Sequence, residues 1–204
     1  MNSLEETSGI EPGPLPHANG KGGTACILLS GGLDSTACLD FALRRGFAVS
    51  ALFIDYGQAA RVQERRSAAL VAERFGVGLR ELKVEGCRGQ GAGLVLGRNA
   101  FLLFLALMES SGECSSIGTG VHAGTRYYDC SRSFIESAQR MFDGYADGRV
   151  RISAPFLDWS KLDIWAYCQA HSVPTALTYS CEIGGETPCG RCLSCRDREA
   201  LHAG

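Results

Sequence analysis

The sequence predicts one α/β domain, built on a parallel sheet, with a small metal-binding tail at its C-terminal end. Apolar runs typical of buried strands alternate with stretches in helical spacing, the order expected of a parallel sheet with right-handed crossovers. Four of the 10 cysteines crowd into residues 181–195. A length of 204 residues suits a single domain with a sizeable core.

The alternation defines the expected elements one by one. Five strands are expected: two buried on both faces, Thr24–Ser30 and Phe47–Asp55, two weaker ones, Gly78–Val84 and Ser115–Val121, and a fifth near Arg149–Ser153. The expected helices are Thr36–Arg45, a segment through Ala68–Phe75 that Gly76 ends, the apolar Ala100–Met108, Ser131–Phe142 and Ser160–His171.

The chain divides into three parts by composition. We expect residues 1–23 to be a disordered leader, residues 24–177 an α/β domain, and residues 178–204 a metal-binding tail packed on that domain. The longest apolar run, Ala100–Met108, is about half of the roughly 20 residues that cross a bilayer. The net charge of -2 favours neither a membrane surface nor nucleic acid. A cytoplasmic protein is expected.

The junction SGGLDS, residues 30–35, lies between the first strand and the first helix. In an open α/β sheet, ligands bind beyond the carboxyl ends of the strands, where the start of a helix attracts phosphate. Gly31 and Gly32 allow close approach of a phosphate, and Ser30 and Ser35 add hydroxyls. The junction fits neither the Walker A pattern nor G-x-G-x-x-G. From these residues alone, a turn that merely caps the helix explains it equally well.

Two further polar segments lie near the same predicted edge of the sheet. Asp55, in FIDYGQ, follows the second strand and is either a ligand or part of a solvated turn. Arg98 and Asn99, in LGRN, precede the apolar helix. Taken alone, Arg98 is best explained as a surface charge and Asn99 as a helix cap. The alternative is that they form a site for a phosphate or a carboxylate.

The tail carries the strongest single signal in the sequence. Cys181, Cys189, Cys192 and Cys195 form a C-x7-C-x2-C-x2-C array, which supplies the four soft ligands of a structural zinc site. An iron–sulfur cluster is the rival, because it uses the same ligands. Core packing explains most of the other cysteines, with Cys130 as a candidate exception: Cys26, Cys38, Cys87, Cys114, Cys130 and Cys168.

These motifs, in this order from Ala25 to Arg198, resemble the 7-cyano-7-deazaguanine synthases of the pyrophosphate-loop ATPase superfamily. The resemblance implies an adenine-nucleotide hydrolase-like, Rossmann-like domain, often dimeric, that cleaves ATP to AMP and pyrophosphate. It also implies that residues 24–177 form a pyrophosphate-loop ATPase domain and that the tail of residues 178–204 binds zinc through its cysteines. Residues implied to bind ATP are Ser30, Gly31, Gly32, Leu33, Asp34, Ser35 and Asp55, with Asp34 near Mg²⁺.

The resemblance also implies catalytic and substrate-binding residues. Asp34, Ser35 and Lys161 would act on the phosphates, although Lys161 also fits a solvated lysine in the first turn of a helix. Residues implied to bind the substrate are Arg98, Asn99, His122 and Asp129, with the chemical role of His122 left open.

The sequence departs from the family pattern around these substrate residues. Leu96 stands where a proline is usual, and the segments EGCRGQGAGLVL and GVHAGTRYYDCSR are short. His122 replaces an asparagine, and one acid is lost, which leaves Asp129 as the best acceptor for a guanine edge. These departures bear on the identity of the substrate.

The expected activity is ATP-dependent activation of the carboxylate of 7-carboxy-7-deazaguanine, followed by condensation with ammonia to give the nitrile through an amide. One alternative keeps the activation but transfers the acyl group to a larger amine, such as a protein N-terminus. Another is a non-catalytic, zinc-containing nucleotide-binding module. A homodimer is expected, with no membrane or direct nucleic-acid partner.

Overall fold

The computed structural model describes residues 23–86, 93–122, 124 and 127–202. Its five strands form one sheet in the order β3-β2-β1-β4-β5, and every neighbouring pair is parallel. The strands are β1 Thr24–Leu28, β2 Ala48–Asp55, β3 Leu79–Lys83, β4 Ser116–Gly118 and β5 Arg151–Ser153. The predicted parallel α/β fold is confirmed. The predicted leader and Cys87 lie outside the described residues, except for Gly23.

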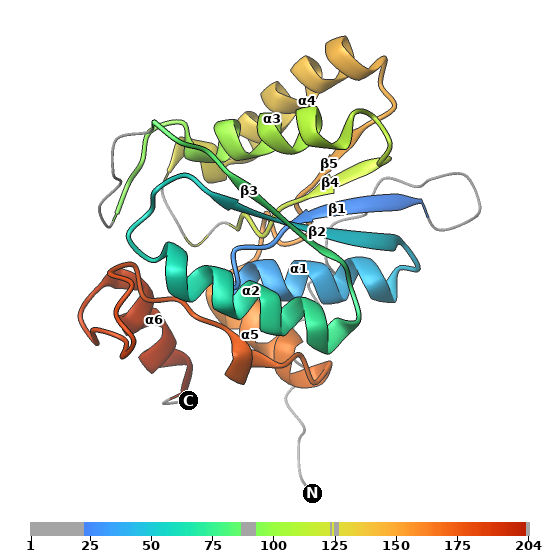
Figure 1. Cartoon of the computed structure of the whole chain (residues 1–204). Coiled ribbons are helices and arrows are strands. Elements are labelled where there is room, and N and C mark those ends of the chain that lie inside the picture. The colour runs from blue at the N-terminus through green and yellow to red at the C-terminus, as the bar shows by residue number, and fades with distance from the viewer. Residues whose placement is uncertain (1–22, 87–92, 123, 125–126, 203–204) are drawn as a thin grey trace, which may run out of the picture.

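Helices cover both faces of the sheet (Figure 1). One layer contains α1 (Leu33–Arg44), α2 (Arg61–Phe75) and α5 (Lys161–Ala170), and the opposite layer contains α3 (Arg98–Ser110) and α4 (Arg132–Ala146). The strand order reverses between β1 and β4, so the chain leaves these neighbours toward opposite layers. A crevice at such a switch point is where α/β sheets of this type bind ligands.

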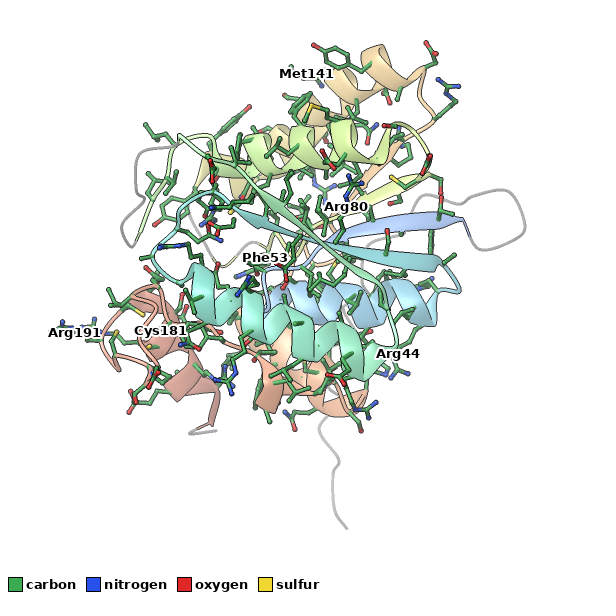
Figure 2. All side chains as sticks on the ribbon, in the orientation of Figure 1. Arg44, Phe53, Arg80, Met141, Cys181 and Arg191 are labelled. Carbon is green, nitrogen blue, oxygen red and sulfur yellow. The ribbon has the colours of Figure 1, made fainter. Side chains whose placement is uncertain are left out.

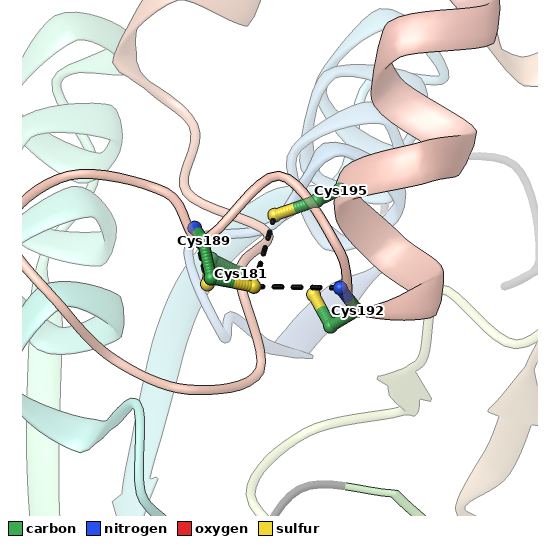
Figure 3. A group of neighbouring side chains, drawn as sticks. All are labelled: Cys181, Cys189, Cys192 and Cys195. Atoms are coloured by element: carbon green, nitrogen blue, oxygen red, sulfur yellow. Dashed lines mark hydrogen bonds between the residues drawn. The ribbon is translucent and has the colours of Figure 1, made fainter.

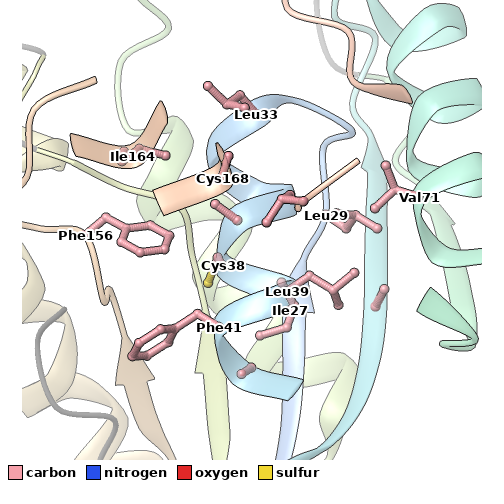
Figure 4. Close-up of a cluster of buried hydrophobic side chains, with 14 of the residues drawn as sticks. Ile27, Leu29, Leu33, Cys38, Leu39, Phe41, Val71, Phe156, Ile164 and Cys168 are labelled. Atoms are coloured by element: carbon pink, nitrogen blue, oxygen red, sulfur yellow. The ribbon is translucent and has the colours of Figure 1, made fainter. Parts of the chain in front are cut away.

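The core consists of two clusters, one on each side of the sheet. Figure 4 shows the larger, in which Ile27 and Leu29 pack against Leu39, Phe41 and residues of neighbouring helices. The second fills the space below α3 and α4. Phe53 lies within the body of the molecule and Met141 on the outer helical layer (Figure 2). Burial on both faces explains why β1 and β2 read as continuous apolar runs.

The predicted boundaries are close to the observed ones, with physical reasons for the differences. The ladder of β1 ends at Leu28, because the chain then opens into the loop before α1. α2 ends before Gly76, which adopts the left-handed conformation with φ 66°, as predicted. α4 continues to Ala146, four residues past its predicted end, and so buries Ala146 as well as Phe142.

The C-terminal segment contains a helix that the sequence analysis missed, α6 (Leu193–His202). The tail begins after a short 3₁₀ helix, η2 (Thr175–Leu177), and its Tyr179 N–H donates to the Gly31 carbonyl at 2.9 Å. The tail therefore contacts the first loop directly, and the boundary at residue 178 stays a prediction. In the described part of the chain, no helix has the length and apolar character needed to span a membrane.

Candidate active site

The loop after β1 has a backbone that only glycine accommodates. Gly31 has φ 78°, and a Cβ there would lie 2.6 Å from the Glu64 carbonyl oxygen. Gly120, in the loop after β4, is equally constrained, because its Cβ would lie 2.6 Å from the Asp34 carbonyl carbon. These clashes would be with backbone atoms, so rotation of a side chain could not relieve them. The two glycines therefore fix the loop between α2 and the segment after β4.

The loop hydroxyls organise the loop without capping α1. The Ser35 hydroxyl donates to the Gly32 carbonyl at 3.1 Å and lies 3.2 Å from the Ser30 hydroxyl. Gly32 is the N-cap of α1, and no side chain makes a capping hydrogen bond there. The explanation of SGGLDS as a turn whose serine or aspartate caps the helix is therefore wrong. The helix start remains available to an anion.

The carboxylate of Asp34 contacts two basic side chains. Its Oδ2 contacts Lys161 Nζ and lies 3.7 Å from His122 Nε2. Its Oδ1 is buried and has no hydrogen-bond partner among the described residues. A buried carboxylate oxygen without a partner suits a hard cation such as Mg²⁺. Burial lowers the pKa of His122, so the imidazole is neutral near pH 7.

α5 positions Lys161 by its own local signals. Ser160 and Asp163 form a capping box, in which the Ser160 hydroxyl accepts from the Asp163 N–H and the Asp163 carboxylate accepts from the Ser160 N–H. Lys161 follows as the first helical residue and reaches Asp34 on α1. The lysine is therefore in contact with the loop, not in the solvated position that the sequence left open.

A cavity of about 240 Å³ opens beside the loop, between α2 and the tail. Six charged residues line it: Asp34, Glu64, Arg98, Lys161, Glu182 and Arg198. The other lining residues are Ser30, Gly32, Leu33, Trp165, Thr178, Tyr179, Ser180, Ser194 and Leu201. These cations and the three carboxylates, beside a helix start that no side chain caps, suit a ligand that has both phosphates and hydrogen-bond donors.

The predicted ATP and catalytic residues fall into two groups. Ser30, Gly32, Leu33, Asp34 and Lys161 line the cavity. Gly31 and Ser35 belong to the loop but are not among the lining residues. Asp55 is also absent from the lining, and its Oδ1 accepts from the Gly57 N–H at 2.9 Å, as in a turn. Its assignment to ATP stays a prediction.

Three of the predicted substrate residues, Arg98, Asn99 and Asp129, lie together at the start of α3, whereas His122 lies beside Asp34. Of the four, only Arg98 lines the cavity. Gly97, in a left-handed conformation, is the N-cap of α3, so the explanation of Asn99 as the cap is wrong. Asn99 instead donates through Nδ2 to the Asp129 carbonyl at 2.9 Å, and its N–H donates to Asp129 Oδ2 at 3.2 Å. The substrate roles of these residues and of His122 stay predictions.

The tail cysteines converge as their spacing predicts (Figure 3). The sulfur atoms of Cys181, Cys189, Cys192 and Cys195 all lie within 4.8 Å of one another. Burial opposes ionisation of Cys181, but N–H groups of Cys189 and Ile183 donate to its sulfur and lower its pKa to about 6. Four clustered thiols, one of them poised as a thiolate, fit a four-coordinate metal or an iron–sulfur cluster.

Sequence reasoning missed the residues by which the tail builds one wall of the cavity. Arg198 donates to the Thr178 carbonyl at 2.9 Å and to the Thr175 carbonyl at 3.0 Å. Glu182 accepts from the N–H and the hydroxyl of Ser194. Glu182 and Ser194 each adjoin a metal-cluster cysteine in sequence, which is the one signal that pointed to them.

The remaining described cysteines match the packing interpretation. Cys26, Cys38, Cys114 and Cys168 are buried, and burial raises the pKa of Cys38 to about 12. Cys130 is half-buried and lies 3.6 Å from Asn99 Nδ2. A raised pKa keeps a thiol protonated and unreactive near neutral pH.

Fold and site together define a parallel α/β protein with a glycine-constrained loop between β1 and α1 and a four-cysteine tail. Two solved structures share the fold. The U34-tRNA thiolase NcsA from Methanococcus maripaludis with its [4Fe-4S] cluster has a TM-score of 0.53 and 14% identity, over 90% of this chain. A 4-thiouridine synthetase–RNA complex with bound ATP has a TM-score of 0.51 and 18% identity, over 89% of this chain. The chain spans 65% and 50% of those two proteins.

Sequence comparison gives the particular family. The model of the family described as "Queuosine biosynthesis protein QueC" matches residues 24–93 and 88–203, and the chain belongs to that family. It is 34% identical over 206 residues to a 7-cyano-7-deazaguanine synthase of Rhizobium meliloti (strain 1021), covering 86% of each chain. It is also 34% identical over 203 residues to one of Aquifex aeolicus (strain VF5), covering 85% of this chain and 93% of that protein.

Proposed function

We propose that this chain is an enzyme that uses ATP to activate the carboxylate of 7-carboxy-7-deazaguanine and condenses it with ammonia, giving 7-cyano-7-deazaguanine. Membership of the QueC family supports the general activity. The observation that carries the proposal is the loop: an uncapped helix start, with Asp34 in contact with Lys161, opens onto a cavity that also contains Arg98 and Arg198.

The proposed chemistry proceeds through an adenylate. A carboxylate oxygen of the substrate attacks the α-phosphorus of ATP, and the bond to pyrophosphate breaks. The nitrogen of ammonia then attacks the activated carbonyl, loses a proton and displaces AMP, which leaves the amide. The amide oxygen attacks the α-phosphorus of a second ATP and displaces pyrophosphate. Loss of AMP and of two protons from the amide nitrogen then gives the nitrile. A carboxylate needs this activation because it is a poor electrophile.

The chain's own groups have distinct roles in these steps. The amides of the loop and the start of α1 hold the phosphates, and Lys161 stabilises the charge that develops on them. Asp34, with its unpartnered buried oxygen, would hold Mg²⁺, which neutralises phosphate charge when bound. Ser35 keeps the loop in shape through its bond to the Gly32 carbonyl.

The four tail cysteines would hold zinc in a structural role. Four sulfurs complete a tetrahedral shell and leave no position for a reactive water. The metal would thus fix the tail, whose Glu182 and Arg198 form one wall of the cavity. Metal analysis of the purified protein tests this choice: one zinc per chain supports it, and iron with acid-labile sulfide contradicts it.

Incubation with ATP and 7-carboxy-7-deazaguanine, with and without ammonia, tests the proposed activity. We expect AMP to form only when the substrate is present, and the nitrile mass to appear only when ammonia is added. Release of ADP and phosphate would overturn the adenylation. AMP formation without an ammonia-dependent product would overturn the assignment of ammonia as the acceptor.

We also propose a homodimer, as the family resemblance implies. The outer side of α3 and α4 exposes large apolar side chains, among them Met108, Met141 and Tyr145. Light scattering at micromolar concentration tests the assembly: twice the chain mass of 21.8 kDa supports it, and a monomer mass contradicts it.

A further inference from the structure

Three carboxylates are among the described residues that line the cavity, and two of them are engaged within the chain. Asp34 contacts Lys161. Glu182 Oε1 accepts from the Ser194 N–H at 3.1 Å and from the Ser194 hydroxyl at 2.9 Å, so it holds the start of α6. The third carboxylate, Glu64, is engaged differently.

Glu64 is aimed into the cavity by a fixed neighbour. Its Oε2 accepts from Gln58 Nε2 at 3.0 Å. Gln58 is itself buried, and its amide is held in place. Its Nε2 also donates to the Ile54 carbonyl, and its Oε1 accepts from the Tyr56 N–H. Among the described residues, nothing makes a hydrogen bond to Glu64 Oε1. One side of this carboxylate is therefore held, and the other is available to a ligand.

Two neighbours favour the ionised form of Glu64 against the effect of burial. Burial raises the pKa of Glu64 overall, while the hydrogen bond from Gln58 and the charge of Arg98 act in the opposite direction. Arg98 and Glu64 line the same cavity. An ionised carboxylate only accepts hydrogen bonds, so its natural ligand presents N–H or O–H donors.

The two purines of the proposed reaction differ at the edge that such a carboxylate reads. A guanine-type edge presents two adjacent donors, the ring N1–H and the 2-amino group. An adenine edge pairs its amino donor with a ring acceptor, which repels a carboxylate. We propose that Glu64 binds the N1–H and 2-amino edge of the 7-deazaguanine substrate and selects that ring over adenine. This inference rests on the proposed function, because it names the residue that recognises the proposed substrate.

Glu64→Gln tests the assignment, with Glu73→Gln, an exposed change on the same helix, as the matched control. The glutamine keeps the size of the side chain but puts a donor where the carboxylate accepts. We expect KM for 7-carboxy-7-deazaguanine to rise about 10- to 100-fold in Glu64→Gln, with KM for ATP within about twofold of the wild type. An unchanged substrate KM, or a rise confined to ATP, overturns the proposal.

Direct binding separates this inference from the proposed function. Calorimetry without ATP compares 7-deazaguanine with 7-deazaadenine on wild type, Glu64→Gln and Glu64→Asp. We expect wild type to prefer 7-deazaguanine, Glu64→Gln to lose most of that preference, and Glu64→Asp to retain it at lower affinity. If wild type shows the preference but makes no AMP, the proposed reaction fails alone. If the preference survives in Glu64→Gln, the role of Glu64 fails alone.

Discussion

The two ends of the cavity use polar residues in opposite ways. At the loop end, Asp34 has a buried oxygen without a partner in the described structure, and the start of α1 has no side-chain cap. At the tail end, Arg198 and Glu182 make several hydrogen bonds within the chain. Groups left unsatisfied are available for chemistry, whereas satisfied groups hold a shape. In the proposed reaction, the loop end would thus be the reactive end and the tail end its scaffold.

The largest expected effect comes from the loop end. Asp34→Asn removes a charge in contact with Lys161 but keeps the size of the side chain. We expect AMP formation to fall about 10²- to 10³-fold, with little change in the thermal midpoint. A turnover assay and a thermal melt of the same preparation check this prediction. A variant with near wild-type turnover would remove Asp34 from the reactive end.

Loss of a tail cysteine tests the scaffold. We expect Cys189→Ser to lose its metal and to lower the thermal midpoint by about 5–10 °C, because metal binding contributes folding free energy. Metal content and thermal unfolding give the result. Cys130→Ser is the control, since Cys130 lies outside the cluster, and it should keep the metal. Full metal content in Cys189→Ser would contradict the assigned ligand set.

Arg198→Lys is expected to have a smaller effect at the same end. The lysine keeps the charge but cannot donate to Thr175 and Thr178 in the forked geometry of the arginine. We expect a loss of about 1–2 kcal/mol of stability and a rise in KM for ATP, with kcat nearly unchanged. Denaturant unfolding and steady-state kinetics measure both. A large fall in kcat with unchanged stability would place Arg198 among the reactive groups.

The smallest expected effect is the pH dependence of stability at Glu64. Because its pKa is raised in the folded state, stability contributed by this group is fully present below its unfolded pKa and is lost as pH rises through the folded pKa. Because glutamine does not titrate, Glu64→Gln removes this pH-dependent loss of stability. The ligand-free variant should therefore gain stability relative to wild type between pH 4 and pH 7. Denaturant unfolding at the two pH values checks this, and a relative loss at pH 7 would contradict it.

The sequence predicted most of the fold, because burial leaves a direct pattern in it. Strands β1 and β2 were found as apolar runs, and Gly76 correctly ended α2. α6 was missed because its start lies within the cysteine array, which was interpreted only as a set of metal ligands. The cysteine cluster was predicted in full, since ligand spacing alone defines it.

The cavity was harder to predict, because distant segments make it. Glu64 and Arg198 reach it from α2 and α6, and no local motif marks either residue. The pairing of Asn99 with Asp129 likewise joins segments 30 residues apart. Capping preferences suggested that Asn99 is the N-cap of α3. In the structure, Gly97 in a left-handed conformation is the N-cap.

Transfer of an isotope label tests the proposed adenylation most directly. 7-Carboxy-7-deazaguanine labelled with ¹⁸O at both carboxylate oxygens is incubated with ATP, ammonia and the enzyme. The mass of the AMP that forms is then measured by mass spectrometry. If the carboxylate oxygen attacks the α-phosphorus, each AMP carries one ¹⁸O. Unlabelled AMP, or ADP with labelled phosphate, would show that the loop around Asp34 does not catalyse adenylation of this substrate.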